Sequence, residues 1–241
     1  MHITIQRSDE RGKGEHGWLH TRHSFSFASY YNPKRMEFGM LRVLNEDVIE
    51  QGKGFGSHGH DNMEIVTIVL EGTLEHKDSM SNQGLIPAGD VQRMSAGTGI
   101  IHSEFNHSKK DKVHLLQIWV LPDEEGIPPE YEQRSFPEKD RRNKLQLVVS
   151  GQSSVSGRKS EALHMHQDAR FFMGSLDKGI EVTHKVAGKD HGLYIFVIKG
   201  ALKLQKEIIR DSDAAEITGA GEIRIKAEQP TEVLLIEVLL R

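Results

Sequence analysis

The sequence has no cysteine among its 241 residues. This absence excludes disulfide bonds, iron–sulfur clusters, thiolate zinc sites and thiol catalysis. Any metal must therefore be held by histidine nitrogen and carboxylate oxygen atoms. The chain has 14 histidines, which supply ample imidazole for such a site.

Long apolar runs and a leader pattern are also missing. The longest apolar runs, such as Ile65–Leu70 and Val233–Ile236, are too short to span a bilayer. The first residues, MHITIQRSDERGKGEHGW, contain no apolar core segment and no cleavage pattern. We therefore expect a cytoplasmic protein without membrane contact. The net charge of −4 argues against a broad nucleic-acid surface, so no direct nucleic-acid partner is expected.

The remaining sequence is typical of an all-β protein. Short runs rich in Val, Ile and Leu alternate with Gly, Asn, Asp and Pro clusters, which is the spacing of a sandwich or barrel. Only Phe27–Tyr31 and Pro129–Gln133 favour short helices. The runs that predict strands are Leu41–Leu44, Ile65–Leu70, Val113–Leu121, Leu145–Val149, Leu193–Ile198 and Val233–Leu240.

A weak internal repeat divides the chain. Glu64–Asp78 (EIVTIVLEGTLEHKD) and Leu193–Lys206 (LYIFVIKGALKLQK) each place an apolar strand before a Gly turn and an alternating strand. Ile86–Asp90 (IPAGD) has an apparent partner in Thr218–Glu222 (TGAGE). Two similar β units are therefore predicted, joined by a Pro-rich and charged stretch.

The residues that carry chemistry lie in the first unit. His58 and His60 are two residues apart, as are His102 and Glu104. On a β-strand this spacing points both side chains of a pair to the same face. Two adjacent strands could aim all four side chains at one transition metal inside a small barrel. The pattern alone leaves Glu64 open as an alternative carboxylate ligand.

Other residues are predicted to have supporting or structural roles. His23 and His114 are candidate orienting partners of metal-bound histidines, and Phe55 and Met63 are candidates for a cavity wall. The Gly-rich strings around positions 52–56 and 97–99 predict tight turns. They do not predict phosphate loops, because neither has the Gly-Lys-Ser/Thr ending or the strand-to-helix setting of such a loop. The remaining histidines are predicted to be exposed or hydrogen-bonded: His16, His20, His76, His107, His164, His166, His184 and His191.

Three segments carry a resemblance to a known family. Gly54–Glu64 (GFGSHGHDNME) and Pro87–Asn106 (PAGDVQRMSAGTGIIHSEFN) resemble the two cupin motifs in the form used by the pirin family. The upstream stretch His16–Asn45, with HSFSFA and LRVLN, is similar to the N-terminal signature of the same family. The likeness is dense in the first half and covers only the general plan of the second.

The resemblance implies an all-β bicupin, with two tandem jelly-roll-like β-barrels. The expected division is an N-terminal metal-binding cupin at residues 1–124, a linker at 125–143 and a C-terminal cupin at 144–241 without metal. It also implies that the carboxylate ligand is Glu104 rather than Glu64. Gly59 departs from the family pattern, where Pro usually separates the two histidines, and this change should affect rigidity more than ligand identity.

The resemblance further implies a metal-dependent dioxygenase that opens the heterocyclic ring of flavonols such as quercetin with O2 and releases CO. One divalent transition metal is expected, with Fe²⁺ first and Zn, Ni, Cu, Mn or Co as alternatives. The metal would lower the pKa of the flavonol 3-hydroxyl, and Glu104, the catalytic residue, would take its proton. The predicted ligands are His58, His60, His102 and Glu104.

Two other functions stay open. The family also includes metal-dependent, redox-sensing binding partners of transcription regulators and metabolic enzymes, so a protein partner is the alternative. A metal-stabilised barrel acting on another small aromatic or enolic compound is the third. An enzyme should have an apolar, ligand-sized cavity opening on the metal, whereas a binding module should have a closed site and an exposed patch.

Overall fold

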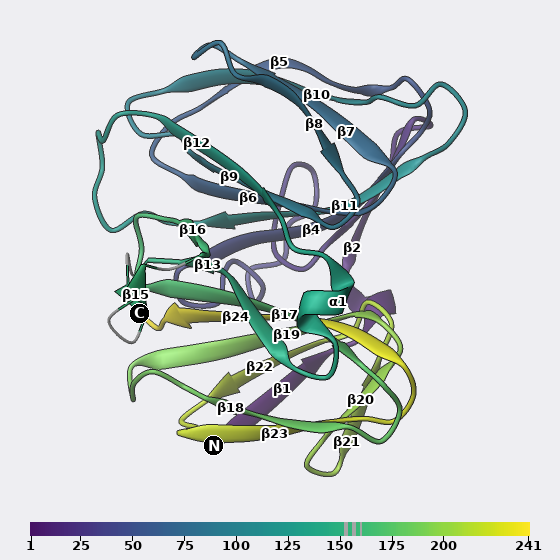
Figure 1. The fold of residues 1–241 in the computed structure, drawn as a ribbon, viewed down its shortest axis with the longest axis vertical. Coiled ribbons are helices and arrows are strands. Elements are labelled where there is room, and N and C mark those ends of the chain that lie inside the picture. Colours follow the sequence, from purple (N-terminus) through teal and green to yellow (C-terminus); the bar gives the residue numbers. More distant parts are fainter. Residues whose placement is uncertain (152–153, 156–157, 160) are drawn as a thin grey trace.

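Two β-barrels stacked one above the other make up the computed structural model of the chain (Figure 1). The structure describes residues 1–151, 154–155, 158–159 and 161–241. The short helical segments are η1 (Ser8–Glu10) and α1 (Glu138–Arg141). None of the helices in these ranges is long and apolar enough to cross a membrane. The predicted all-β class is confirmed.

The first barrel has a larger and a smaller sheet. The larger sheet contains β2 (Gly12–Glu15), β3 (Leu19–His23), β4 (Leu41–Ile49), β6 (Glu64–Glu71), β9 (Asp90–Ser95), β11 (Val113–Val120) and β12 (Glu130–Ser135). The smaller sheet contains β5 (Gly54–His60), β7 (Thr73–Asp78), β8 (Gln83–Pro87) and β10 (Ile100–Asn106). Their strand orders are β12-β9-β6-β11-β4-β3-β2 and β5-β10-β7-β8.

The second barrel repeats this plan. Its larger sheet contains β1 (His2–Gln6), β13 (Leu145–Ser150), β16 (Leu163–His164), β17 (Ala169–Leu176), β19 (His191–Lys199), β22 (Ala214–Thr218) and β24 (Thr231–Leu239). Its smaller sheet contains β18 (Glu181–Lys185), β20 (Ala201–Leu204), β21 (Glu207–Arg210) and β23 (Glu222–Ala227). The orders are β1-β22-β19-β24-β17-β13-β16 and β18-β23-β20-β21, and β14 (Ser154–Val155) pairs with β15 (Arg158–Lys159) outside both barrels.

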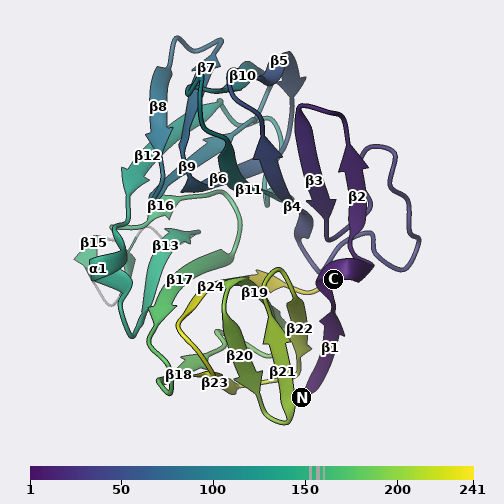
Figure 2. The same cartoon turned by 90° about the vertical axis from the view of Figure 1, so that its right-hand side faces the viewer.

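The two strand orders correspond position by position, and this shows how the barrels are joined. The N-terminal strand β1 pairs with β22 of the second barrel, at the place that β12 occupies beside β9 in the first. Figure 2 shows β1 lying along the lower barrel while the chain continues into β2 and β3 above. Residues 1–6 therefore complete the second barrel, and the predicted linker 125–143 contains a strand of the first.

Both predicted short helices were wrong. Residues 130–135 form β12, because their backbone groups pair antiparallel with β9. Around residues 27–31 the chain makes a tight turn closed by a bridge between Phe27 and Tyr30. Ala28 has a φ of +49° there, which is a left-handed conformation that a helix cannot contain.

The internal repeat is only partly correct. The hairpins β6–β7 and β19–β20 occupy equivalent places, and each turns at a glycine with positive φ, Gly72 at +80° and Gly200 at +104°. The correspondence predicted between residues 86–90 and 218–222 was wrong, because residues 88–89 connect β8 to β9 whereas 219–221 connect β22 to β23. The shared Gly-rich composition reflects turns at different points of the same topology.

The largest hydrophobic core lies between the barrels. Alternate residues of the two larger sheets, such as Val66 and Ile68 on β6 and Leu234 and Ile236 on β24, belong to one buried cluster. The opposite residues of β24, Val233 and Leu235, fill the second barrel. In the first barrel the interior is capped by two small apolar clusters, and this arrangement leaves a buried polar region between them.

Candidate metal centre

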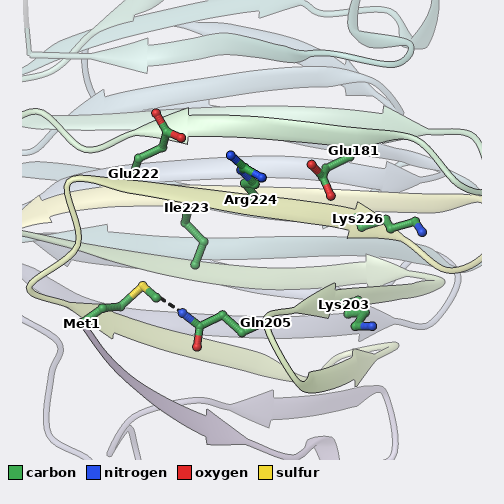
Figure 3. Close-up of a pocket in the computed structure, with 8 residues that line it drawn as sticks. All are labelled: Met1, Glu181, Lys203, Gln205, Glu222, Ile223, Arg224 and Lys226. Atoms are coloured by element: carbon green, nitrogen blue, oxygen red, sulfur yellow. Dashed lines mark hydrogen bonds between the residues drawn. The ribbon is translucent and has the colours of Figure 1, made fainter.

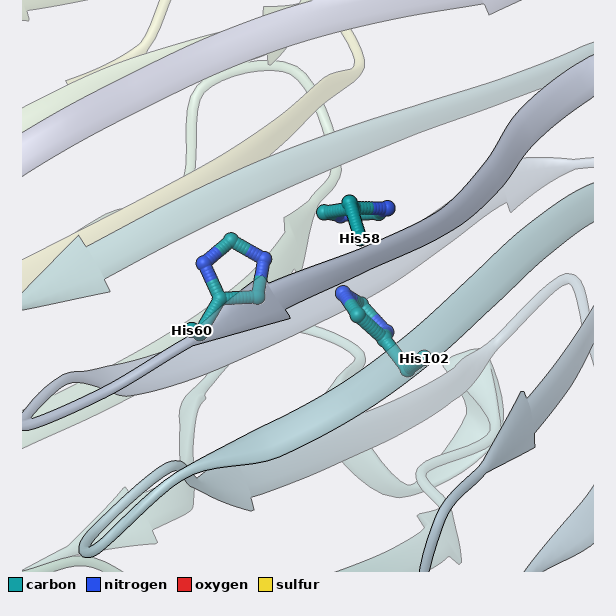
Figure 4. A group of neighbouring side chains, drawn as sticks. All are labelled: His58, His60 and His102. Atoms are coloured by element: carbon teal, nitrogen blue, oxygen red, sulfur yellow. The ribbon is translucent and has the colours of Figure 1, made fainter.

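Three histidines meet inside the first barrel. The side chains of His58 and His60 project inward from β5, and β10 places His102 directly opposite His58. The ring centroids of His58 and His102 lie 4.4 Å apart, and His60 lies 4.9 Å and 5.0 Å from them. One nitrogen of each ring lies within 4.8 Å of the others. Figure 4 shows the three rings turned toward a common point.

The neighbours of these rings fix their orientation. His58 Nδ1 lies 2.8 Å from the carbonyl oxygen of Gly56, so donation from Nδ1 leaves Nε2 as the free lone pair. The edge of Trp119 packs against His60, with centroids 4.9 Å apart and planes at 81°. A metal-binding histidine needs this kind of orienting contact.

Burial keeps the imidazoles of His60 and His102 neutral. Desolvation, together with the positive charge that neighbouring imidazoles would carry, lowers the pKa of His60 to about 4 and that of His102 to about 3. Neither buried nitrogen of His102 has a hydrogen-bond partner, nor does Nε2 of His60, among the described residues. Unpartnered buried nitrogens are costly, and neutral lone pairs are what a metal cation binds. The residues present therefore fit a metal.

Glu104 lies beside this triad on β10, with its side chain buried. Gln117 Nε2 donates to Glu104 Oε2 at 2.9 Å, and Trp119 Nε1 donates to Gln117 Oε1 at 3.3 Å. Glu104 Oε1 has no hydrogen-bond partner in the described part of the chain. A carboxylate oxygen of Glu104 lies within 4.8 Å of ring nitrogens of His102 and His76, and Glu104 is not grouped with His58 and His60. His102 is thus shared between the histidine triad and Glu104.

His76 is a component of the site that the sequence did not single out. It was predicted to be exposed or hydrogen-bonded, and it is fully buried beside His102 and stacked on Tyr131 at 5.0 Å. His76 Nε2 bonds Asp78 Oδ2 at 3.3 Å, and its Nδ1 lies 3.5 Å from Gln92 Nε2. Both nitrogens are therefore engaged. The i, i+2 spacing of His76 and Asp78 was the signal that could have revealed this buried pair.

Glu64, the alternative carboxylate, lies elsewhere. Ser95 Oγ donates to Glu64 Oε2 at 3.0 Å, and Ser95 in turn receives a hydrogen bond from the buried Arg93. Burial raises the pKa of Glu64, with its hydrogen bond to Ser95 acting in the opposite direction. Glu64 belongs to neither donor group found among the described residues. Its contacts are those of a structural side chain.

The two histidines considered as orienting partners have other roles. His23 Nδ1 lies 2.8 Å from Asn45 Oδ1, and His114 Nε2 lies 3.1 Å from Glu46 Oε1. No hydrogen bond joins either ring to a predicted ligand within the described ranges. The sequence could not place them, because both lie on strands of the larger sheet whose register only the fold determines.

Glycines bring β5 and β10 together, although of the two predicted turns the first is shorter than expected, since Gly54 and Gly56 lie on β5. A Cβ on Gly54 would lie 2.2 Å from the carbonyl oxygen of Glu104, so β5 and β10 could not approach with any other residue there. Gly97, with a φ of +49°, shapes the turn before β10. At Gly59 a Cβ would meet only the Ile100 carbonyl oxygen, at 3.8 Å, so the position tolerates larger residues.

A cavity of about 280 Å³ lies near the cluster, and none of the four predicted ligands is among the residues that line it. It lies where β5 faces β3 and β4, and its aromatic walls include Phe55, one of the two predicted candidates; Met63 instead packs in an apolar cluster. Phe55 also contacts the His58 ring, with centroids 6.3 Å apart. The cavity is lined by His16, Trp18, Leu19, Thr21, His23, Phe27, Ala28, Asn45, Asp47 and Phe55.

The described residues of the second barrel form no comparable interior. The inward positions of its smaller sheet include Val182, Ile223, Ile225 and Ala227, which pack in an aliphatic core. Its hollow of about 530 Å³ lies on the outer face, where Arg224 and other charged side chains alternate with the buried ones (Figure 3).

Known proteins similar to this chain agree with the geometry. A quercetin 2,3-dioxygenase of Escherichia coli strain K12 is 44% identical over 98% of each chain. Residues 4–120 match the family model described as pirin, and residues 140–238 match that of the quercetinase C-terminal cupin domain. This chain belongs to the pirin family. The predicted bicupin fold is confirmed.

A metal ion is present in a solved structure of a similar protein. The crystal structure of the bacterial pirin YhhW from E. coli, in complex with nickel(II), superposes with a TM-score of 0.93 at 43% identity and covers 100% of both chains. A pirin-like protein of Caulobacter vibrioides is 38% identical over 95% of this chain and 96% of its own. The chain is thus quercetin 2,3-dioxygenase-like in sequence along nearly its whole length, and its His/Glu cluster is consistent with a divalent metal.

Proposed function

We propose that this pirin is a metal-dependent dioxygenase that opens the heterocyclic ring of flavonols such as quercetin with O2 and releases CO. One observation carries the proposal: a cluster of imidazoles with unpartnered buried nitrogens, together with an unpartnered carboxylate oxygen, lies near a cavity with aromatic walls. The similarity to quercetin 2,3-dioxygenases supports the choice of substrate class.

We assign the metal to His58, His60, His102 and Glu104. The unpartnered atoms of His60, His102 and Glu104 support this set, whereas the nitrogens of His76 are both engaged by hydrogen bonds. Three imidazoles and one carboxylate suit several divalent transition metals. Iron(II) is the expected metal from the sequence, and the nickel complex of the E. coli pirin makes nickel the second to test.

When bound, the metal supplies Lewis acidity, which favours the ionised form of a bound hydroxyl and orients the reactants. The chain's own residues do the rest. Glu104 accepts the proton of the flavonol 3-hydroxyl, and Gln117 fixes the carboxylate by donating to Oε2. Trp18 and Phe55, packed edge to face at 5.2 Å, provide an apolar wall against the flat substrate and exclude water.

A non-enzymatic, redox-sensing binding partner is the alternative. That function requires no cavity next to the metal, so the cavity near the cluster supports the enzyme. A metal-dependent oxygenase of another small enolic aromatic compound would use the same residues. Measuring the turnover of quercetin distinguishes among these functions.

The test combines metal analysis with a quercetin assay. Protein loaded with Fe²⁺ or Ni²⁺ is mixed with quercetin under air and under nitrogen, and the loss of flavonol absorbance and the release of CO are followed. We expect oxygen-dependent loss of quercetin with stoichiometric CO. If no metal gives oxygen-dependent loss, the dioxygenase proposal is wrong.

Two variants separate metal binding from chemistry. His58→Ala should lower both metal content and turnover, whereas Glu104→Gln should keep a substantial part of the metal and lose about 100-fold or more in kcat. Glu64→Gln is the matched control, because it removes a buried carboxylate outside the cluster. Full turnover by metal-loaded Glu104→Gln would contradict the role of Glu104 as the base.

A further inference from the structure

A buried carboxylate that the proposed chemistry does not use lies in the cavity wall. Asp47, on β4, is 4% exposed and lines the cavity. Its Oδ1 has no hydrogen-bond partner in the described part of the chain. Buried carboxylate oxygens are normally paired, and an unpaired one is costly. Burial, and then the negative charge of Glu104, raise the pKa of Asp47 to about 7, although its side-chain contact with the hydroxyl of Thr21 lowers it.

The second barrel shows that the fold does not require this carboxylate. In the sheet registers, Asp47 lies opposite Leu115 of β11, and Gly174 lies opposite Val233 of the equivalent strand β24. A glycine thus occupies the corresponding position. The nearby cation Arg11 is committed to Glu46, with Nη1 to Oε2 at 2.6 Å. Apart from its contact with Thr21, Asp47 is therefore available to a ligand through Oδ1.

The cavity has two kinds of wall. Trp18, Phe27 and Phe55 supply flat apolar surface, while Asp47 and Asn45 come from the polar side. Asn45 Oδ1 is occupied by His23, whereas Asp47 Oδ1 is a carboxylate acceptor without a hydrogen-bond partner in the described part of the chain, with the Thr21 hydroxyl beside it. A flat aromatic ligand that carries a hydroxyl group would satisfy both walls at once.

We propose that Asp47 determines specificity by binding, through Oδ1, a phenolic hydroxyl of the substrate other than the reacting 3-hydroxyl. The site then selects polyhydroxylated flavonols over flavonols that carry the 3-hydroxyl alone. This inference rests on the proposed function, since it assumes that a flavonol occupies the cavity. A substrate without the second hydroxyl would leave the buried carboxylate unpaired, and a site built for a hydroxyl rejects such analogues strongly.

Two ligands and two variants test this assignment. Quercetin carries further hydroxyls, whereas 3-hydroxyflavone has only the reacting one. Dissociation constants of the metal-loaded protein are measured under nitrogen by quenching of tryptophan fluorescence, because Trp18 lines the cavity. The wild type should bind quercetin at least about 10-fold more tightly than 3-hydroxyflavone.

Asp47→Leu should weaken quercetin binding about 10- to 100-fold and change 3-hydroxyflavone binding by less than about 2-fold. Asp47→Asn, which keeps a hydrogen-bonding group of the same shape, should recover part of the loss and serves if the leucine variant does not fold. Under air, kcat/KM for the two substrates should show the same selective change. Equal losses for both ligands, or no loss for quercetin, would overturn the assignment.

The failures of the two proposals are distinguishable. If the wild type binds quercetin but no metal supports turnover, the dioxygenase function fails and the binding measurements still decide the role of Asp47. If the wild type turns over quercetin and Asp47→Leu affects both ligands alike, only the role of Asp47 fails. If the wild type binds neither ligand, both are wrong.

Discussion

The two barrels share one strand order and differ in what fills them. On the lumen side of the larger sheet, the first barrel has Thr67 and Gln117, paired across β6 and β11. At the corresponding place, where β19 pairs with β24, the second has Ile195 and Leu235. The first lumen is therefore polar at its centre, while the second is aliphatic there.

Each barrel has a histidine at the equivalent place in its smaller sheet, and the two histidines differ in their partners. His60 ends β5 opposite Ile100, and His184 lies on β18 opposite Ile223. His60 packs against Trp119 and has an unpartnered Nε2, whereas His184 Nε2 bonds Glu237 Oε2 at 2.7 Å. The same topology thus presents a free imidazole in one barrel and a satisfied one in the other. The surrounding side chains, and not the barrel itself, make a metal site.

The largest expected effect comes from removing one histidine in each barrel. His102→Ala should abolish stoichiometric metal binding, because it deletes the ring shared by the triad and Glu104. His184→Ala should leave the metal content unchanged and destabilise the second barrel by about 1–3 kcal/mol, since Glu237 loses a partner. Metal per chain, measured by mass spectrometry after dialysis, and chemical unfolding provide the readouts. Metal loss in His184→Ala would break the comparison.

A second pair of variants separates stability from function. Leu235 is fully buried in the aliphatic core, so Leu235→Ala should cost about 2–5 kcal/mol of unfolding free energy and leave kcat of the folded protein unchanged. Gln117→Leu should cost little stability, yet it removes the hydrogen bond that holds Glu104 and should lower kcat about 10-fold. Urea unfolding and the quercetin assay measure the two effects. Similar behaviour of both variants would mean that the lumens are not specialised.

The smallest effect concerns the contact between the barrels. Ser212 of the second barrel donates to Glu46 Oε1 at 3.0 Å. Burial raises the pKa of Glu46, but hydrogen bonds from His114 and Arg11 and the Arg11 charge outweigh it and lower the pKa to about 2. Because the folded-state pKa is depressed, this contribution to stability is complete above the ordinary value of 4.5 and is lost as the pH falls toward 2.

Between those two pH values the wild type should lose more unfolding free energy than Glu46→Gln, by on the order of 2 kcal/mol after discounting for partial exposure. Urea titrations at a series of pH values measure the difference. Glu15→Gln is a suitable control, because Glu15 is exposed and lies away from the barrel contact. Parallel acid profiles of the wild type and Glu46→Gln would show that Glu46 does not stabilise this contact.

Much of the candidate site could be predicted from local sequence. Strand periodicity places His58 with His60, and His102 with Glu104, on common faces, because side chains alternate along a strand. The same alternation and the turn residues predicted an all-β protein with two similar units. Local patterns failed where backbone pairing decides: Pro129–Gln133 was predicted as a helix, but its backbone groups find partners on β9.

By itself the sequence determined the all-β class, the most apolar strands, the two pairs of candidate ligands and the absence of thiol chemistry, since these depend on residue type and near-neighbour spacing. Only the tertiary structure decided that β1 completes the distant barrel and that His76 is buried beside the cluster. It also placed Glu64 away from the cluster and left Asp47 with a free oxygen in a cavity. These features depend on sheet register and on contacts between distant segments, and strand periodicity fixes the face of a residue but not the neighbour it meets there.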